Sequence, residues 1–178
     1  MKVRWIGNAC VDMISDERVI IDPHPTVELR GKADKILITH EHHFDKDKFD
    51  SISEDAEVYA PKHTLDKFNI RGKPVTPGDE FSDIKVLDCE CWNSEESVGY
   101  YYKGILHPGD AAEFYVENRV LIAFSPCFES DHDDHLQSII GIDTGMVIPF
   151  HYDPKNDLQA AEGLIELLKK KTIYRVNC

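Results

Sequence analysis

Histidines crowd one short stretch of the chain, His40-Glu41-His42-His43, directly after the apolar run Ile36-Leu37-Ile38. The apolar run is typical of a short buried strand, so the histidines stand where that strand ends. Neutral imidazole binds zinc, iron and nickel, and is acceptable for manganese. In an extended loop His40 and His42 point to the same side, because alternate residues share a face. The stretch therefore predicts a metal-binding loop. The alternative is a solvated turn in a chain that has 9 histidines.

Two other segments end in residues that bind metals. In Leu106-His107-Pro108-Gly109-Asp110 a strand stops at Pro-Gly and presents an acid. In Val147-Ile148-Pro149-Phe150-His151 a buried strand ends on a histidine. Loops that follow strands converge over a rigid scaffold, where functional side chains concentrate. These segments and the histidine stretch predict a site with imidazoles from two loops and a carboxylate from a third.

The elements that must position these residues are short and alternate in type, which predicts an α+β domain spanning residues 1–178. We expect strands at 3–6, 10–14, 19–22, 36–38, 58–60, 84–91, 99–102, 105–107, 121–124, 147–150 and 173–176. We expect helices at 45–52, 64–68, 133–140 and 158–171. The last helix carries apolar residues at helical spacing and is amphipathic. This order predicts two mixed sheets covered by helices.

Composition narrows the class of protein. The 178 residues carry a formal net charge of -13, which disfavours nucleic-acid binding through a general basic surface. No stretch reaches the roughly 18 apolar residues of a membrane span, and the N-terminus lacks the apolar core of a signal peptide. The 5 cysteines are odd in number and show no CxxC pair, so we expect reduced thiols and a cytoplasmic location. Oligomeric state stays open.

Six segments of the chain, in order, resemble one known family. They are Trp5-Ile6-Gly7-Asn8-Ala9-Cys10, Ile20-Ile21-Asp22-Pro23, Ile36-Leu37-Ile38-Thr39-His40-Glu41-His42, Ser97-Val98-Gly99-Tyr100, Gly109-Asp110 and Ile148-Pro149-Phe150-His151-Tyr152. The chain resembles the metallo-β-lactamase-fold hydrolases, most closely their short lactonase-like branch, which includes the ascorbate-6-phosphate lactonases. The resemblance spans nearly the whole length, and the order of the segments makes it specific.

The resemblance implies a four-layer αβ/βα sandwich with one or two metal ions between the sheet edges. It implies that His40 and His42 hold the first metal ion and that His151 holds the second. Asp110 would bridge the two ions, and His43 would be a further ligand. It also implies catalytic roles for Asp110 and His43. A metal in such a site lowers the pKa of bound water towards 7 and polarises a carbonyl or phosphoryl group.

Two metal ligands of the family pattern are missing, and a His beside the site is replaced. The family loop reads His-x-His-x-Asp-His followed by Phe-Asp, whereas this loop runs from His40 to Asp45 without the inner Asp. A gapless alignment places Phe44 at the Asp position and Asp45 at the last His. We favour a two-residue deletion, which aligns His43 with the last His of the family loop, because it keeps the following helix in register. The strand before Ser97 lacks the family's His. Cys91 is a candidate substitute there, since thiolate binds zinc, and a core position behind the site is the alternative. Asn8 replaces a further His.

Several other residues are candidates for supporting roles. Asp45 is near enough in sequence to compensate for the lost Asp. His107 precedes the Gly-Asp turn and is expected to support it from behind. His24 could contact the substrate or support a metal ligand. The alternative is that it belongs to an ordinary loop. His135 is a candidate inward ligand, although an acidic first helical turn beginning near His132 is the simpler interpretation.

We therefore expect a metal-dependent hydrolase that uses metal-activated water on a small ester, lactone or phosphodiester. Zinc is the default for an imidazole-rich site, with manganese and iron as alternatives. The partner is a small-molecule substrate, and neither nucleic acid nor membrane is expected. The lost ligands motivate the alternative hypothesis of a degenerate, non-catalytic member of this fold that binds a ligand or another protein. A nuclease is disfavoured by the charge.

Overall fold

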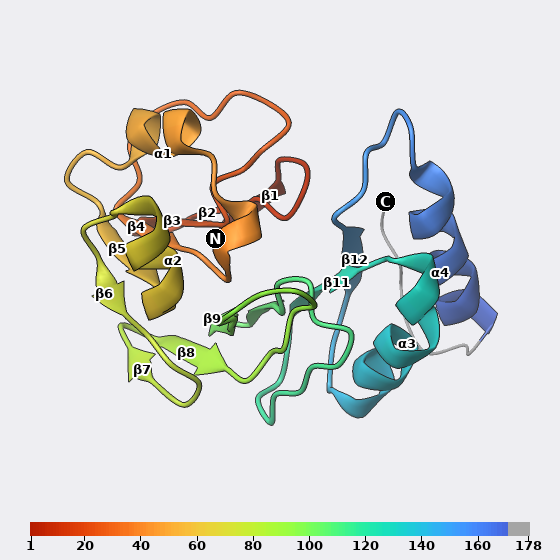
Figure 1. The fold of residues 1–178 in the computed structure, drawn as a ribbon. Coiled ribbons are helices and arrows are strands. Elements are labelled where there is room, and N and C mark those ends of the chain that lie inside the picture. The colour runs from red at the N-terminus through yellow and green to blue at the C-terminus, as the bar shows by residue number, and fades with distance from the viewer. Residues whose placement is uncertain (171–178) are drawn as a thin grey trace.

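The computed structural model describes residues 1–170, and the strand expected at 173–176 lies outside the described residues. Two six-stranded sheets pack face to face, each with a continuous strand order, β1-β2-β3-β4-β5-β6 and β12-β11-β10-β9-β8-β7. In Figure 1 α1 and α2 lie on the side of the first sheet, and α3 and α4 lie on the opposite side beside β11 and β12. The order of layers is therefore helix, sheet, sheet, helix, and the predicted α+β sandwich is confirmed.

The first sheet begins with antiparallel pairs and continues as a parallel sheet from β3 to β6. Its strands are β1 (Lys2–Trp5), β2 (Val11–Ile14), β3 (Arg18–Ile21), β4 (Lys35–Leu37), β5 (Glu57–Ala60) and β6 (Lys73–Pro74). The apolar runs of β3 and β4 are buried on both faces, because successive side chains of a strand point to opposite faces of the sheet and both faces are covered. Ile20 and Ile36 pack under the helices, and Ile21 and Leu37 pack against the second sheet.

The second sheet has the reverse layout, with antiparallel pairing from β7 to β10 and parallel pairing from β10 to β12. Its strands are β7 (Glu80–Phe81), β8 (Ile84–Leu87), β9 (Gly99–Tyr102), β10 (Ile105–His107), β11 (Ile122–Pro126) and β12 (Val147–Phe150). The core between the sheets includes Tyr100, Phe124 and Phe150, each with 0% of its surface exposed.

Within residues 1–170, four α-helices and two 3-10 turns lie between or after the strands. They are η1 (Glu41–His43), α1 (Lys46–Ile52), α2 (Lys62–Phe68), η2 (Glu129–Asp131), α3 (His132–Gly141) and α4 (Leu158–Lys170). Asp45 caps α1, because its carboxylate accepts a hydrogen bond of 3.1 Å from the Lys48 amide. The described residues contain no helix long and apolar enough to cross a membrane.

The expected elements agree with the observed ones except at a few positions. The strand expected at 84–91 ends at Leu87, because Leu87 pairs with Gly99, the first residue of its partner β9. Beyond Leu87 the Ser97 hydroxyl takes the place of the hydrogen bonds between strands. It accepts a hydrogen bond from the Cys91 amide and donates one to the Cys89 carbonyl. The two-residue strands β6 and β7 were not predicted, since so short a run has no measurable alternation.

Candidate metal centre

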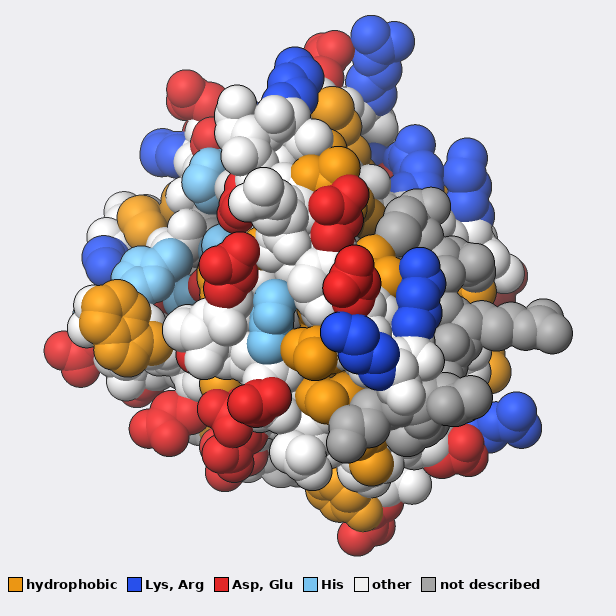
Figure 2. Space-filling model, turned by 90° about the vertical axis from the view of Figure 1, so that its right-hand side faces the viewer, with side chains coloured by type: hydrophobic (Ala, Val, Ile, Leu, Met, Phe, Trp, Pro, Cys, Tyr) orange, Lys and Arg blue, Asp and Glu red, His pale blue; other side chains and the backbone are white. Residues whose placement is uncertain are grey.

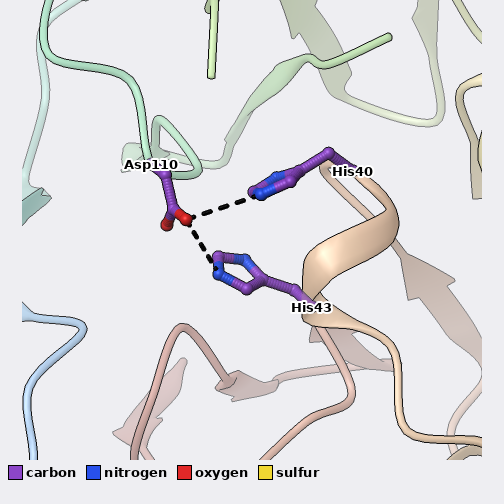
Figure 3. Close-up of side chains that lie close together, drawn as sticks. All are labelled: His40, His43 and Asp110. Carbon is purple, nitrogen blue, oxygen red and sulfur yellow. Dashed lines mark ion pairs between the residues drawn. The ribbon is translucent and has the colours of Figure 1, made fainter. Parts of the chain in front are cut away.

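The candidate site lies where parallel strands of both sheets end. His40 and His43 follow β4, Asp110 follows β10, and His151 follows β12. Figure 3 shows the two histidines of the first sheet pointing at the carboxylate of Asp110. Loops at the carboxyl ends of parallel strands meet over the sheet edge, which is where open α/β sheets place their ligands. Each of the three loops singled out in the sequence contributes one side of the group.

The histidine loop is not extended, so the reason given for pairing His40 with His42 was wrong. Glu41–His43 forms a 3-10 turn, and residues three apart in such a turn share a side. His40 and His43 therefore face the same way and are 0% and 3% exposed. The His42 side chain is 45% exposed and meets the His40 ring edge-on, with 5.1 Å between ring centroids. The structure groups His43, rather than His42, with His40 and Asp110.

Three histidine side chains approach Asp110 closely. Oδ2 of Asp110 lies 3.5 Å from His40 Nε2 and 3.2 Å from His43 Nε2. Oδ1 of Asp110 lies 3.5 Å from His151 Nε2, and the Nε2 atoms of His151 and His43 are 3.0 Å apart. Ligand atoms of His40, His43 and Asp110 all lie within 4.8 Å of one another, a spacing that can hold one metal ion.

Asp22, at the end of β3, orients both histidines of the loop. Its carboxylate accepts 2.7 and 2.8 Å hydrogen bonds from the Thr39 amide and hydroxyl, and it lies 3.0 Å from Nδ1 of His43. A carboxylate only accepts, so His43 carries its proton on Nδ1. The Thr39 hydroxyl donates to Asp22 and therefore accepts from Nδ1 of His40 at 3.0 Å. In the neutral form of each ring, Nε2 is therefore the nitrogen that presents a lone pair towards Asp110.

Buried polar atoms without hydrogen bonds mark the point where these side chains converge. Nε2 of His40 and Oδ1 of Asp110 are both buried and make no hydrogen bond. Leaving such a group unpaired costs about 1–3 kcal/mol, and more if it is charged. A divalent cation would satisfy both atoms at once, because imidazole nitrogen and carboxylate oxygen are ordinary zinc ligands. The donor set therefore fits a metal ion.

The pKa values of Asp110 and His43 depend strongly on each other. Burial alone would raise the pKa of Asp110, but His43, His40 and His151 hold it well below its usual range. Burial would lower the pKa of His43, yet Asp110 and Asp22 raise it to about 10. In the absence of a cation, a proton on His43 offsets the two carboxylates. A metal ion would displace that proton, so metal binding releases a proton at neutral pH.

Two residues behind Asp110 hold its turn in place, as the sequence suggested for His107. Nε2 of His107 donates to the Ala9 carbonyl at 2.7 Å, and Nδ1 accepts from the Gly109 amide at 3.2 Å. Sγ of Cys91 lies 3.3 Å from the Asp110 amide and accepts its hydrogen bond. Burial raises the pKa of the Cys91 thiol to about 12, and Asp110 adds to the effect. Cys91 lies behind the carboxylate and outside the three-residue ligand group.

His151 occupies an unusual backbone conformation. Its φ is 60°, in the left-handed region that costs a non-glycine residue about 1–3 kcal/mol. Its amide donates to the carbonyl of Asn8, which is itself left-handed with a φ of 51° and also accepts from the Trp5 indole. Asn8 thus acts through its backbone on the segment that carries His151. Strain of this kind persists only where the surroundings fix it, and it aims the imidazole at Asp110.

The remaining predicted residues lie further away. Asp45 caps α1 and pairs with Lys48 at 3.4 Å, so its carboxylate is engaged outside the ligand group. His24 is half-buried beside the loop, and its buried Nδ1 makes no hydrogen bond. His135 is fully buried in α3, where Nδ1 donates to the Ala112 carbonyl at 3.1 Å. It supports the segment after Asp110 from behind.

Glu41, between the two inward histidines, faces the opposite way and anchors the turn. Its side chain is 3% exposed, and it accepts a 2.7 Å hydrogen bond from the Ser94 hydroxyl. Lys67 of α2 lies 3.7 Å from it. Burial alone would raise the pKa of Glu41, but Ser94, the backbone amides of Glu41 and Glu95, and Lys67 lower it to about 2. A buried, ionised carboxylate therefore ties the histidine turn to the loop after β8.

Asp22 and Thr39 are the functional residues that the sequence alone did not identify. Asp22 was noted only as part of a resembling segment, and Thr39 only as the residue before His40. The available signal was an acidic residue at the end of the apolar run Ile20-Ile21, a position that is buried on both faces. A buried aspartate needs hydrogen-bond partners, and here Thr39 and His43 of the histidine loop supply them.

Comparison with known proteins gives relatives of one kind. No family model matches the chain. A UPF0173 protein of Pyrococcus furiosus is 28% identical over an alignment of 195 positions, gaps included, which covers 96% of this chain and 92% of the relative. A UPF0173 metal-dependent hydrolase of Methanoculleus marisnigri is 24% identical, covering 86% and 81%. A UPF0173 protein of Pyrococcus abyssi is 42% identical over 126 residues, covering 62% and 60%.

A solved structure establishes the fold. A Thermotoga maritima protein described as a zinc-dependent hydrolase of the metallo-β-lactamase superfamily superposes with a TM-score of 0.63 at 13% identity. The match covers 93% of this chain and 84% of that protein. The relatives do not single out the lactonase-like branch, which stays a prediction. The chain therefore has the metallo-β-lactamase fold and is similar over most of its length to UPF0173 proteins.

Proposed function

We propose that the chain is a metal-dependent hydrolase that holds one divalent ion on His40, His43 and Asp110. The observation that carries the proposal is the convergence of unpaired ligand atoms, His40 Nε2 and Asp110 Oδ1, in a group spanning 4.8 Å. Three protein ligands with an open position are the pattern of catalytic rather than structural zinc. The naming of a relative as a metal-dependent hydrolase supports the same function. Bound there, the ion would supply an acidified water and a Lewis acid for a carbonyl.

His151 is placed to move the proton in such a reaction. The sequence predicted it as a ligand of a second ion, but the ligand group in the described residues has three members and supports one. Burial lowers the pKa of His151 below its usual value despite the nearby Asp110, so the imidazole is neutral and can accept a proton. In ester hydrolysis the water oxygen joins the acyl carbon and the ester bond breaks. The proton passes through His151 to the departing oxygen.

The substrate is proposed to be a small ester or lactone, as in the lactonase-like branch that the sequence resembles. Zinc is the proposed ion, because the group is rich in imidazole, and metal analysis distinguishes it from manganese and iron. The four cysteines in the described part of the chain are free thiols, which supports the proposed cytoplasmic location.

Metal content and hydrolysis test the proposal together. Protein purified without chelator should contain about one ion per chain. In zinc titrations His40→Ala and Asp110→Ala should each weaken binding by at least about tenfold, since each removes a ligand. Asp50→Ala, which removes an exposed carboxylate of α1, should leave the affinity within about twofold.

Two results would overturn this function. A metal content near zero would remove the site itself. One bound ion without hydrolysis of any ester, lactone or phosphodiester in the presence of zinc or manganese would favour the non-catalytic ligand-binding alternative.

A further inference from the structure

A cleft of about 720 Å³ opens beside the metal centre and reaches the Asp110 carboxylate. Three loops form it: the loop after β8 with Trp92, the segment after β10 with Asp110, and the approach to η2 with Phe128. Its volume lies within the roughly 300–1,000 Å³ of small-molecule sites. The cleft is therefore the place where the non-reacting part of a substrate would lie.

Two aromatic side chains form walls of this cleft. Trp92 is 86% exposed, an unusual state for the largest apolar side chain. Phe128 packs edge-on against the ring of His151, with 4.9 Å between centroids, so this wall adjoins the candidate proton acceptor. A flat ring bound against Trp92 would cover exposed indole surface, at about 25 cal/mol per Å² of apolar area removed from water.

The charged side chains on the cleft are acidic. Asp110 and Asp131 line it, and the lining in the described residues includes neither lysine nor arginine. Figure 2 shows acidic side chains and histidines together on one face, with most blue side chains towards its top and right. An ion at the metal centre would offset Asp110 but leaves Asp131 on the wall. A phosphate or carboxylate held in the cleft away from the ion would thus meet the like charge of Asp131 and no lysine or arginine. The polar donors of the described lining are His42, Asn93 and Ser130.

We propose that this cleft selects substrates whose non-reacting part is a flat apolar group that is neutral or positively charged. Trp92 is the residue that determines this specificity, since indole is the strongest aromatic partner for a cation. The inference rests on the proposed hydrolase function and deepens it. It disfavours phosphorylated substrates of the kind that the ascorbate-6-phosphate lactonases suggest, because the described lining holds no lysine or arginine to offset their charge.

A matched series of aryl acetates tests the proposal with the zinc-loaded protein. Phenyl acetate, 4-(trimethylammonio)phenyl acetate and 4-sulfophenyl acetate share one reacting ester and differ in the charge of the remote group. With kcat/KM divided by the rate of reaction with hydroxide, the neutral and cationic esters should exceed the sulfonate by about tenfold or more. The charge preference should shrink as salt is raised to 1 M, where the screening length is about 3 Å.

Variants assign the preference to residues. Trp92→Ala should lower kcat/KM for phenyl acetate by about tenfold, with Trp92→Phe restoring most of it, and should change kcat/KM for methyl acetate by less than about twofold. Asp131→Lys should reverse the preference towards the sulfonate. Asp16→Lys, the same charge change in the exposed turn after β2, should not. The inference would be overturned if Trp92→Ala lowered kcat/KM for methyl acetate as much as for phenyl acetate. A preference of the unmodified protein for the sulfonate would also overturn it.

Binding of inert ligands separates this inference from the proposed function. The methyl ethers of the three phenols cannot be hydrolysed, and their binding to the zinc-loaded protein should quench the fluorescence of Trp92. If no ester, lactone or phosphodiester is hydrolysed, the hydrolase function fails, while the order of the binding affinities still tests the selectivity of the cleft. Tighter binding of the neutral and cationic ethers upholds the selectivity. Equal or tighter binding of the sulfonate refutes it.

Discussion

Replacing Glu41 by glutamine should destabilise the metal-free chain by about 2 kcal/mol at pH 7. The pKa of this buried carboxyl falls from the usual 4.5 to about 2 in the folded protein. At about 1.4 kcal/mol per tenfold change in proton affinity, that difference corresponds to about 3 kcal/mol. We reduce the figure because Lys67 is 45% exposed and its attraction is screened by solvent. The expected fall in melting temperature is about 4–8 °C for a chain of this size.

The pH dependence gives the sharper test. Because the pKa is lower in the folded state, the stabilisation is complete above the unfolded value of 4.5 and is lost as pH falls towards about 2. Urea unfolding with chelator present at pH 7, 5.5, 4 and 3 should therefore show the gap between wild type and Glu41→Gln closing below about pH 4.5. Glu95→Gln, an exposed change in the loop after β8, is the matched control. A gap below about 0.5 kcal/mol at pH 7, or one unchanged at pH 3, would refute the reasoning.

Three further predictions concern the support of the site and the core. Asp22→Asn should weaken zinc binding by about 10–100-fold in competition titrations, because it disturbs the protonation of His43. Gly99→Ala should cost about 1–3 kcal/mol in urea unfolding, since its methyl would lie 2.5 Å from the Cys89 sulfur, whereas Gly141→Ala has open space and should not destabilise. Leu164→Ala, which opens a cavity under α4, should cost about 2–5 kcal/mol by the same measurement.

The ends of the strands were readable from the sequence because local signals mark them. Pro108-Gly109 stops β10 and leaves Asp110 at its exit, and the apolar run of β12 stops before His151. Apolar runs with turn residues after them identify such positions without any knowledge of the partners. This is why both sheets and the segments that carry the ligands were predicted.

The inner geometry of the site was not readable, because it depends on contacts between distant segments. Whether His42 or His43 faces inward is decided by the 3-10 turn, which the buried Glu41 stabilises through Ser94 far along the chain. The role of Asp22 depends on β3 lying beside β4, a pairing that places its carboxylate against Thr39. No local pattern contains that information.

The ligands come from both halves of the sandwich, and this has a consequence for how the chain matures. His40 and His43 leave the first sheet, whereas Asp110 belongs to the second, so a held ion cross-links segments that are far apart in sequence. An ion present at 100 times its dissociation constant would add about 2.7 kcal/mol to the stability of the native state. Capture of the ion is then a late event that only a chain with both sheets docked can perform. Metal supply would set the lifetime of the finished molecule as well as the occupancy of its site.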